Sequence, residues 1–339
     1  MGLIFKGLKW LGLGLLVLLV VGAIYQQIGA ALDAKLAPPA DQMVSVNGHA
    51  VHLDCVGNGQ RTYVLDAGAG AGAFEWWRLL PLLAKTGRVC AFDRPGLGWS
   101  ESSGGTHDAV ASAHELAGLV RAAKIPVPFI YVGHSLGANI GIVYRDLYPH
   151  DVAGLVLIEP GNPKDLLEDF HGTRDEAMGQ RPDCGFICYT AGAAAYLGIA
   201  RLSVLIAVPG GKNLSGPALN EYRAILARPS HVMATVSSFI DALPKTAYED
   251  MGVRTFGNTP VVVFASSKRF NGDGFDSQAD YDKWRIEQHA YLASLAAMSA
   301  HGAGPIAIPD SNHSSMVMGE RQSIFLAQEI LRFATRNKL

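Results

Sequence analysis

The chain has 339 residues, of which 49% are hydrophobic and 17% are charged, so it can bury a large core and is neither disordered nor fibrous. Its formal net charge of −2 provides no basic face for a phosphate backbone, and nucleic acid is therefore not an expected partner. This length suits two domains or a single large α/β domain.

The N-terminal segment is a candidate membrane anchor. Lys6 and Lys9 precede an apolar run from Trp10 to Ile24, and counted from Leu3 the segment is long enough to cross about 30 Å of hydrocarbon. Lysines before the run, with no cluster of them after it, favour an N-in orientation that places the rest of the chain outside the cytoplasm. A cleaved signal peptide is the alternative, and a buried helix of the globular domain is a third interpretation. Either of the first two exports the domain.

The chain contains four cysteines, an even number in a protein expected to meet an oxidising compartment. Cys184 and Cys188 are close enough in sequence to bridge, whereas Cys55 and Cys90 fall in separate strand-like segments. No histidine stands beside them at metal-ligand spacing, so we expect no metal site. Buried free thiols are the default expectation, because cysteine is often simply a small core residue.

The elements after the anchor alternate between strand and helix. A linker at 37–41 leads to a predicted hairpin over 44–53, with Asn47-Gly48 as its turn. Further strands are predicted at 62–66, 88–92, 128–132, 153–158, 260–265 and 304–308. Helical periodicity falls at about 74–85, 108–124, 136–148 and 278–300. This alternation predicts a mainly parallel sheet covered on both faces, with the hairpin as its antiparallel edge.

The alternation stops between Glu159 and Thr259, where helical patches with many Gly and Pro residues predict a cap over the ligand crevice. The predicted organisation is an anchor with the start of the linker at 1–36, a core at 37–159 and 259–339, and a helical cap at 160–258. Two stretches of the cap, 185–189 and 202–208, are strongly apolar. They either pack the cap onto the core or line a tunnel for an apolar substrate close to the membrane surface.

A glycine-rich turn follows the predicted strand at 62–66. Gly68-x-Gly70-x-x-Ala73 could let a pyrophosphate approach a helix, with Asp93 as the ribose ligand of a nicotinamide-dependent enzyme. The same small residues could instead let a backbone N–H face a reacting carbonyl. We prefer the second interpretation, because nothing else in the chain requires a phosphate site.

The segment Gly133-His134-Ser135-Leu136-Gly137 lies between a predicted strand and a predicted helix. A serine hydroxyl needs a base within hydrogen-bond reach and a site open to substrate, and a tight strand-to-helix turn places it at the top of a sheet. Glycines two residues to either side remove Cβ atoms that would clash in such a turn. Ser135 is therefore the candidate nucleophile, with His134 lining the turn.

The base and the acid of a catalytic triad are expected at the same edge of the sheet. His313 follows the last predicted strand in a polar turn and is the candidate general base. No acid follows the strand at 260–265 at once, although Asp273 could fold back and Asp276 is a weaker choice. Glu159, which ends the strand after the nucleophile, is the alternative that we slightly prefer.

With these motifs the chain resembles the α/β-hydrolase family over roughly residues 44–337, and within it a bacterial group with an N-terminal anchor. The elbow at 133–137, the segment 88–100 and the histidine loop at 311–313 carry the resemblance, together with Asp66-Ala67-Gly68-Ala69-Gly70. It implies an eight-stranded sheet, a Ser-acid-His triad and a helical cap. It also implies that the backbone N–H groups of Ala69 and Leu136 form the oxyanion hole. The acid absent after the strand at 260–265 is the departure from the family pattern.

The expected function is that of a serine hydrolase acting on an ester or related acyl bond of an apolar small molecule, without a cofactor. Epoxide hydrolases and dehalogenases of this fold use a carboxylate where Ser135 stands. A cofactor-free perhydrolase would use the same residues. A non-catalytic protein that binds a hydrophobic ligand under its cap is the alternative from another class.

Overall fold

The computed structural model describes residues 2–36, 42–105, 107–168, 185–206, 214, 216–268 and 277–339. The predicted linker at 37–41, Cys184, Asp273 and Asp276 lie outside these residues. Among the described residues, eight strands form one sheet in the order β1-β2-β4-β3-β5-β6-β7-β8. Their bounds are β1 Gln42–Val46, β2 His49–Val56, β3 Thr62–Asp66, β4 Arg88–Phe92, β5 Phe129–His134, β6 Val152–Ile158, β7 Val261–Ser266 and β8 Gly302–Ile308.

The sheet confirms the predicted topology. Strands β3 to β8 pair in parallel, and the hairpin β1–β2 forms the antiparallel edge against β4. Asn47 and Gly48 both have positive φ, 49° and 91°, which is the backbone that a two-residue hairpin turn needs. Because the carboxyl ends of parallel strands meet at one edge, the residues that follow β3, β5, β6 and β8 are brought together there.

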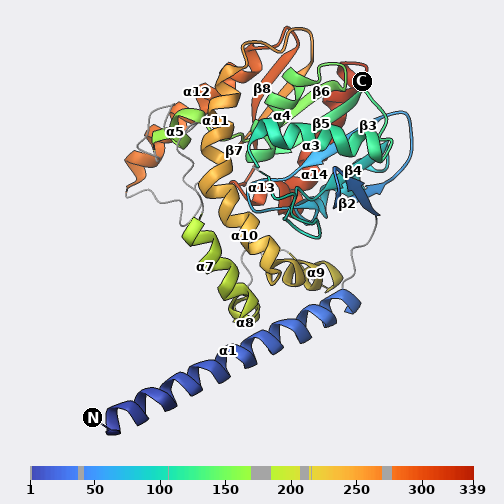
Figure 1. The fold of residues 1–339 in the computed structure, drawn as a ribbon. Helices are drawn as coiled ribbons and strands as arrows, with labels where there is room; N and C mark the ends of the chain where they lie inside the picture. The colour runs from blue at the N-terminus through green and yellow to red at the C-terminus, as the bar shows by residue number, and fades with distance from the viewer. Residues whose placement is uncertain are drawn as a thin grey trace.

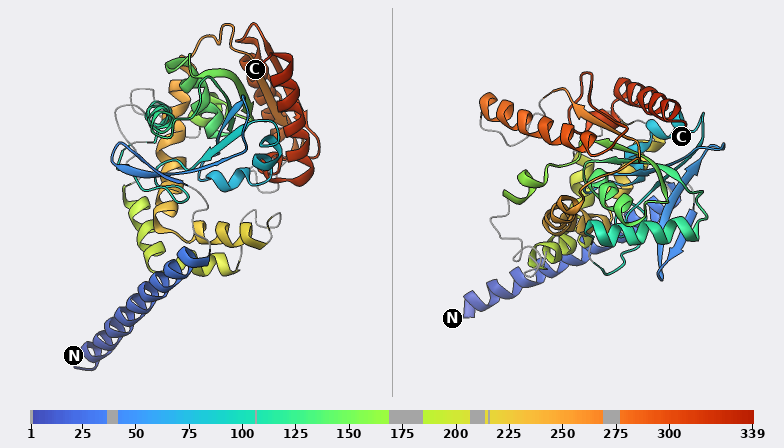
Figure 2. Two further views of the ribbon diagram at one scale, coloured as in Figure 1. Left: turned by 90° about the vertical axis from the view of Figure 1, so that its right-hand side faces the viewer. Right: turned by 90° about the horizontal axis from the view of Figure 1, so that it is seen from above.

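Helices cover both faces of the sheet (Figures 1 and 2). The helices of the sheet layers are η1 Ala73–Trp76, α2 Leu79–Leu83, α3 Ala109–Ala122, α4 Leu136–Leu147, α12 Gln278–Ala297, α13 Ser315–Met318 and α14 Glu320–Arg336. One buried core contains residues of α3, α4 and α12, and the other contains residues of α2, α13 and α14. The predicted helix at 74–85 is divided into η1 and α2, and α14 was not predicted.

The expectation of free thiols was wrong for the first two cysteines. Cys55 in β2 and Cys90 in β4 face each other in the antiparallel register and form a disulfide. The strand-like segments that seemed to separate them are in fact neighbours in the sheet. No free cysteine occurs in the described part of the chain.

The described elements between β6 and β7 are helices joined by short non-helical segments, with one isolated bridge at Gly257. The helices are α5 Pro163–Glu168, α7 Gly185–Tyr196, α8 Ile199–Ile206, α9 Gly216–Leu226, α10 Pro229–Ser237, η3 Ser238–Ala242 and α11 Leu243–Gly252. The ring of Phe74, after β3, packs 4.6 Å from that of Tyr222 in α9, and the Gly98 N–H, after β4, donates to Nδ1 of His231 in α10 at 3.1 Å. These helices therefore cover the loops at the carboxyl edge of the sheet.

The N-terminal helix α1, Gly2–Leu36, projects from the molecule on the side of α7, α8 and α9 (Figure 1). Its segment Phe5–Lys35 is long and apolar enough to cross a membrane, and almost all of its large apolar side chains are exposed. In the described part of the chain, α1 packs against α7, α8 and α9 through its C-terminal part.

Candidate active site

Ser135 occupies a strained turn between β5 and α4. Its φ of 51° and ψ of −121° lie outside the regions that a non-glycine residue ordinarily adopts. The Ser135 N–H donates to the Ile158 carbonyl at 2.9 Å, and its own carbonyl accepts the N–H groups of Ala138 and Asn139. These bonds hold the half-buried Ser135 side chain at the carboxyl edge of the sheet.

The two glycines of the motif are required by the close approach of the backbone. A Cβ atom on Gly133 would lie 2.5 Å from the Gly137 carbonyl oxygen, and one on Gly137 would lie 2.6 Å from the Ala67 carbonyl oxygen. Contacts this short are not tolerated, so any side chain at either position would displace the turn. The spacing Gly-x-Ser-x-Gly is thus a packing requirement of this site.

His313 lies in the loop after β8 and contacts Glu159, which follows β6. The Nδ1 atom of His313 is 2.7 Å from Oε2 of Glu159, and the other oxygen of Glu159 accepts the Ser266 N–H at 2.8 Å. The His313 side chain is 45% exposed, whereas Glu159 is almost fully buried. A carboxylate on Nδ1 leaves Nε2 of His313 free to accept a proton from a candidate nucleophile, as the base of a catalytic triad requires.

The environment of Glu159 keeps its carboxyl group ionised. Burial raises its pKa, but the hydrogen bonds and charge of His313, with the N–H of Ser266, lower it by more, so that the net pKa lies below the usual range. Glu159 also has a positive φ of 44°, a strained backbone that fixes the direction of its side chain. The other predicted acid, Asp273, lies outside the described residues. Ser135 and His313 do not hydrogen-bond directly, which is common where no substrate is bound.

The glycine-rich turn after β3 is held from one side by Arg94. The Arg94 guanidinium pairs with Asp66 and donates to the carbonyls of Ala67 and Gly68 at 2.6 Å each. A trans peptide points its C=O and the following N–H in opposite directions, so this contact turns the Ala69 N–H away from Arg94. A Cβ atom on Gly68 would lie 3.5 Å from Cβ of Ser135, which places the turn directly against the candidate nucleophile.

Two backbone donors at this position lack an acceptor. Neither the Ala69 N–H nor the Leu136 N–H makes a hydrogen bond in the described part of the chain. Leu136 is the first residue of α4, so its N–H also lies at the positive end of the helix dipole. Both predicted oxyanion donors are therefore available to a ligand oxygen.

A second carboxylate–histidine pair lies beside Ser135, the candidate nucleophile. Glu75, in η1, accepts the Gly68 N–H at 2.9 Å and contacts Nδ1 of His134 at 2.8 Å. Nε2 of His134 lies 3.0 Å from the His313 carbonyl oxygen. Glu75 and His134 are both almost fully buried, so the pair links the glycine-rich turn to the histidine loop through the interior.

The structure gives Asp93 a role that excludes ribose binding by its carboxylate. Its oxygens accept the N–H groups of Ala73 and Trp99 at 2.7 and 2.8 Å and contact Nδ1 of His52 at 2.8 Å. Asp93 instead ties the loops after β3 and β4 together. Among the described residues, no group of three or more His, Cys, Asp or Glu side chains could hold a metal ion.

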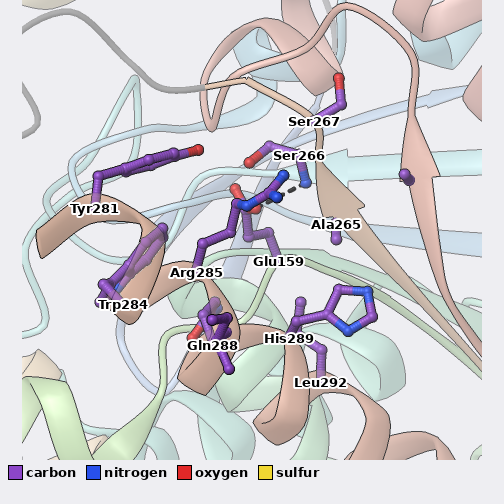
Figure 3. Close-up of a pocket in the computed structure, with 12 residues that line it drawn as sticks. Glu159, Ala265, Ser266, Ser267, Tyr281, Trp284, Arg285, Gln288, His289 and Leu292 are labelled. Atoms are coloured by element: carbon purple, nitrogen blue, oxygen red, sulfur yellow. Dashed lines mark hydrogen bonds between the residues drawn. The ribbon is translucent and has the colours of Figure 1, made fainter. Parts of the chain in front are cut away.

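A cavity of about 370 Å³ adjoins Glu159 between the carboxyl end of β7 and the helix α12 (Figure 3). Tyr281, Trp284, Arg285 and Gln288 of α12 are among its lining residues, and the Arg285 side chain points toward Glu159 and Ser266. Space for a small ligand group therefore exists beside the buried acid.

The sequence model of the alpha/beta hydrolase family matches residues 63–327, which is most of the chain. The chain belongs to the alpha/beta hydrolase family.

Two curated relatives of this alpha/beta hydrolase match it over shorter stretches. YqjL of Bacillus subtilis is 30% identical over 121 residues, which are 35% of this chain and 48% of YqjL. The 2-hydroxy-6-oxo-2,4-heptadienoate hydrolase of Pseudomonas putida is 35% identical over 122 residues, which are 34% of this chain and 43% of that enzyme. The chain thus spans a little under half the length of these two relatives.

Solved structures share the fold of this alpha/beta hydrolase over nearly its whole length. A thermophilic esterase from Thermogutta terrifontis superposes with a TM-score of 0.55 at 18% identity, covering 87% of this chain and 98% of the esterase. Epoxide hydrolase CorEH superposes with a TM-score of 0.61 at 17% identity, covering the same shares of the two chains. At these identities the likeness establishes the fold alone.

Three residues of this site were missed or only partly interpreted from the sequence. Glu75 stands between Phe74 and Trp76 in an apolar run, and a lone acid in such a run is a signal of a buried, paired charge. Arg94 lay within a segment that carried the family resemblance, without a role of its own. His134 was expected to line the turn, but its bond to the His313 carbonyl joins elements 179 residues apart and left no sequence signal.

Proposed function

We propose that this alpha/beta hydrolase is a serine hydrolase that cleaves an ester or related acyl bond of an apolar small molecule. The observation that carries the proposal is the 2.7 Å contact of His313 with Glu159 at the same sheet edge as the strained Ser135. Serine at the elbow argues for acyl transfer rather than for the carboxylate chemistry of epoxide opening. The relative from Pseudomonas putida that is named a hydrolase adds support.

In the proposed reaction Ser135 attacks the carbonyl carbon while Nε2 of His313 accepts the hydroxyl proton. Glu159 stabilises the resulting imidazolium through Nδ1. The N–H groups of Ala69 and Leu136 hold the oxyanion, and removal of one such donor typically costs about 2.7–4 kcal/mol of transition-state stabilisation. His313 then protonates the leaving alcohol, and water attacks the acyl-enzyme with His313 again acting as base.

The proposed location is the membrane, with the helical cap at 160–258 and the catalytic core outside the cytoplasm. The apolar helix α1 and the lysines at its start support this orientation, and the disulfide between Cys55 and Cys90 supports an oxidising compartment. A secreted form produced by cleavage within α1 is the alternative.

The proposal is tested with an active-site-directed fluorophosphonate probe and a short p-nitrophenyl ester. The wild-type protein should be labelled and should turn over the ester, whereas Ser135→Ala should do neither while retaining its circular dichroism spectrum and melting temperature. Labelling that persists in Ser135→Ala contradicts the assignment of the nucleophile. A folded wild-type protein that neither reacts nor hydrolyses would favour the ligand-binding alternative.

A further inference from the structure

The helices α7 and α8 expose an unusually apolar surface. Their 12 and 8 residues include one charged side chain, that of Arg201. Eight large apolar side chains of the pair are more than half exposed, among them Phe186, Ile187, Tyr189, Leu202, Leu205 and Ile206. So many exposed apolar side chains on one helix pair mark an interaction site rather than an ordinary water-facing surface.

The helix α1 contacts this pair at the level where α1 is expected to leave the hydrocarbon of the membrane. Twenty residues of α-helix rise about 30 Å, so a span that starts at Phe5 leaves the hydrocarbon at about Ile24. The corner between α7 and α8 packs at that level. A Cβ atom on Gly22 would lie 2.5 Å from the Leu197 carbonyl oxygen, and one on Gly198 would lie 2.7 Å from Cδ1 of Tyr25.

Polar contacts continue above this level and hold α1 to the cap. Nη2 of Arg201 lies 2.6 Å from Oδ2 of Asp33, and its Nε donates to the Gln26 side chain at 3.1 Å. Gln26 is 2% exposed and donates to the Ala227 carbonyl at 3.0 Å. The single charge of α7 and α8 is therefore paired with α1, which leaves the exposed surface of the pair without a net charge of its own.

We infer that the helix pair α7–α8 lies in the interfacial region of the bilayer that α1 spans. Its surface is continuous with the membrane-spanning helix, and α7 runs across the axis of α1 rather than along it, as a helix lying on the membrane surface does (Figure 1). A phospholipid surface is therefore the partner that covers these side chains, in preference to a second copy of the chain.

Further contacts join α7, through α10, to the glycine-rich turn of the candidate active site. A Cβ atom on Gly192 of α7 would meet the Met233 side chain of α10. Two residues further along α10, Thr235 lies against Gly70 of the glycine-rich turn. This part of the inference rests on the proposed function: an apolar ester dissolved in the bilayer reaches Ser135 through the cap without crossing bulk water.

Membrane contact is tested by photo-crosslinking of the full chain reconstituted in phosphatidylcholine vesicles. p-Benzoylphenylalanine is placed singly at Phe186 and Leu205, and as a control at Val127, which is 50% exposed before β5 at the opposite edge of the sheet. Mass spectrometry should detect phospholipid adducts at 186 and 205 in at least tenfold higher yield than at 127. Equal yields, or crosslinks to a second copy of the chain, would overturn the inference. This readout does not depend on catalysis.

Delivery from the bilayer is tested with Leu205→Glu/Ile206→Glu and the matched control Val127→Glu/Leu147→Glu. The first variant should lose at least tenfold turnover of a long-chain p-nitrophenyl ester embedded in vesicles but keep its turnover of soluble p-nitrophenyl acetate. The control should keep both. Equal loss on both substrates, or no loss on either, contradicts delivery through the membrane. A wild-type protein inactive on both would refute the proposed function, and the crosslinking yields would still decide the docking.

Discussion

The Nδ1 atom of His134, the residue before the candidate nucleophile Ser135, lies 2.8 Å from Oε1 of Glu75. Both side chains are almost fully buried. Nε2 of the same ring faces the His313 carbonyl, which can only accept, so both ring nitrogens must carry protons if Glu75 is ionised. Burial lowers the pKa of His134, but the charge and hydrogen bond of Glu75 raise it by more, and the net shift is upward. The pair is therefore an ion pair beneath the site.

Replacement of Glu75 by glutamine should release the proton of His134 and loosen both the glycine-rich turn and the histidine loop. We expect kcat for an ester to fall by about 10- to 100-fold, the usual cost of misplacing catalytic groups by about 1 Å. The control is Glu115→Gln, which removes the carboxylate 3.3 Å from His49, away from the site, and should leave kcat unchanged. Equal kcat in the wild type and Glu75→Gln would exclude a positioning role.

The Glu75–His134 ion pair should also stabilise the fold in a limited pH window. The raised pKa of His134 contributes stability below about pH 6.5 that is lost as the pH rises, and the lowered pKa of Glu75 contributes stability above about pH 4.5 that is lost as the pH falls. The difference in urea-unfolding free energy between the wild type and Glu75→Gln should therefore be largest near pH 5.5. A difference that grows steadily to pH 9 would contradict this assignment.

The identity of the triad acid is tested by Glu159→Gln and Asp273→Asn. Loss of the carboxylate at His313 should lower kcat by about 10³- to 10⁴-fold, because the neutral imidazole loses the partner that fixes its tautomer and the imidazolium loses its counter-charge. Asp273→Asn should stay within about threefold of the wild type. The reverse ranking would transfer the role to Asp273.

The orientation of the Ala69 peptide should depend on the fork geometry of Arg94. Lysine keeps the charge but cannot bond Asp66 and both carbonyls at once, so Arg94→Lys should lower kcat by about tenfold or more with little change in KM. Arg145 is a matched control, because it donates to the carbonyls of Thr255 and Phe256 and to Thr259, far from the site. If Arg145→Lys lowers kcat as much as Arg94→Lys does, the effect is one of general stability.

Asp250 links the nucleophile helix to the cap and should make stability fall as the pH rises toward neutrality. It accepts from Asn139 at 2.6 Å and from the Tyr291 hydroxyl at 3.0 Å, and burial raises its pKa to about 7. Between about pH 4 and 7 the folded chain holds a proton that the unfolded chain has released, so each pH unit costs about 1.4 kcal/mol. Neighbouring Glu249, whose burial raises its pKa to about 7, adds to the slope. Asp250→Asn should reduce the slope measured by urea unfolding from pH 5 to 7 to the part that Glu249 contributes, and an unchanged slope would refute its role.

The strand, turn and helix around Ser135 could be predicted from the sequence, because neighbouring residues determine them. The place of His313 could also be predicted, because it follows the last strand and the loops after parallel strands lie at the same edge of the sheet. Contacts between distant elements were not predictable. The Asn139–Asp250 bond joins residues 111 apart, and the Arg94 contacts depend on β3 and β4 being neighbours. The helix α14 was not predicted, although its buried apolar residues line one core.

The bond between Cys55 and Cys90 has a practical consequence for anyone who purifies this protein. It fastens the edge hairpin to β4 across 35 residues of sequence, a constraint worth about 3–4 kcal/mol if it acts by restricting the unfolded chain. That contribution exists only where thiols are oxidised. Material produced in a reducing cytosol is therefore a less stable molecule than material exported before folding, and the choice of expression compartment decides which of the two is measured.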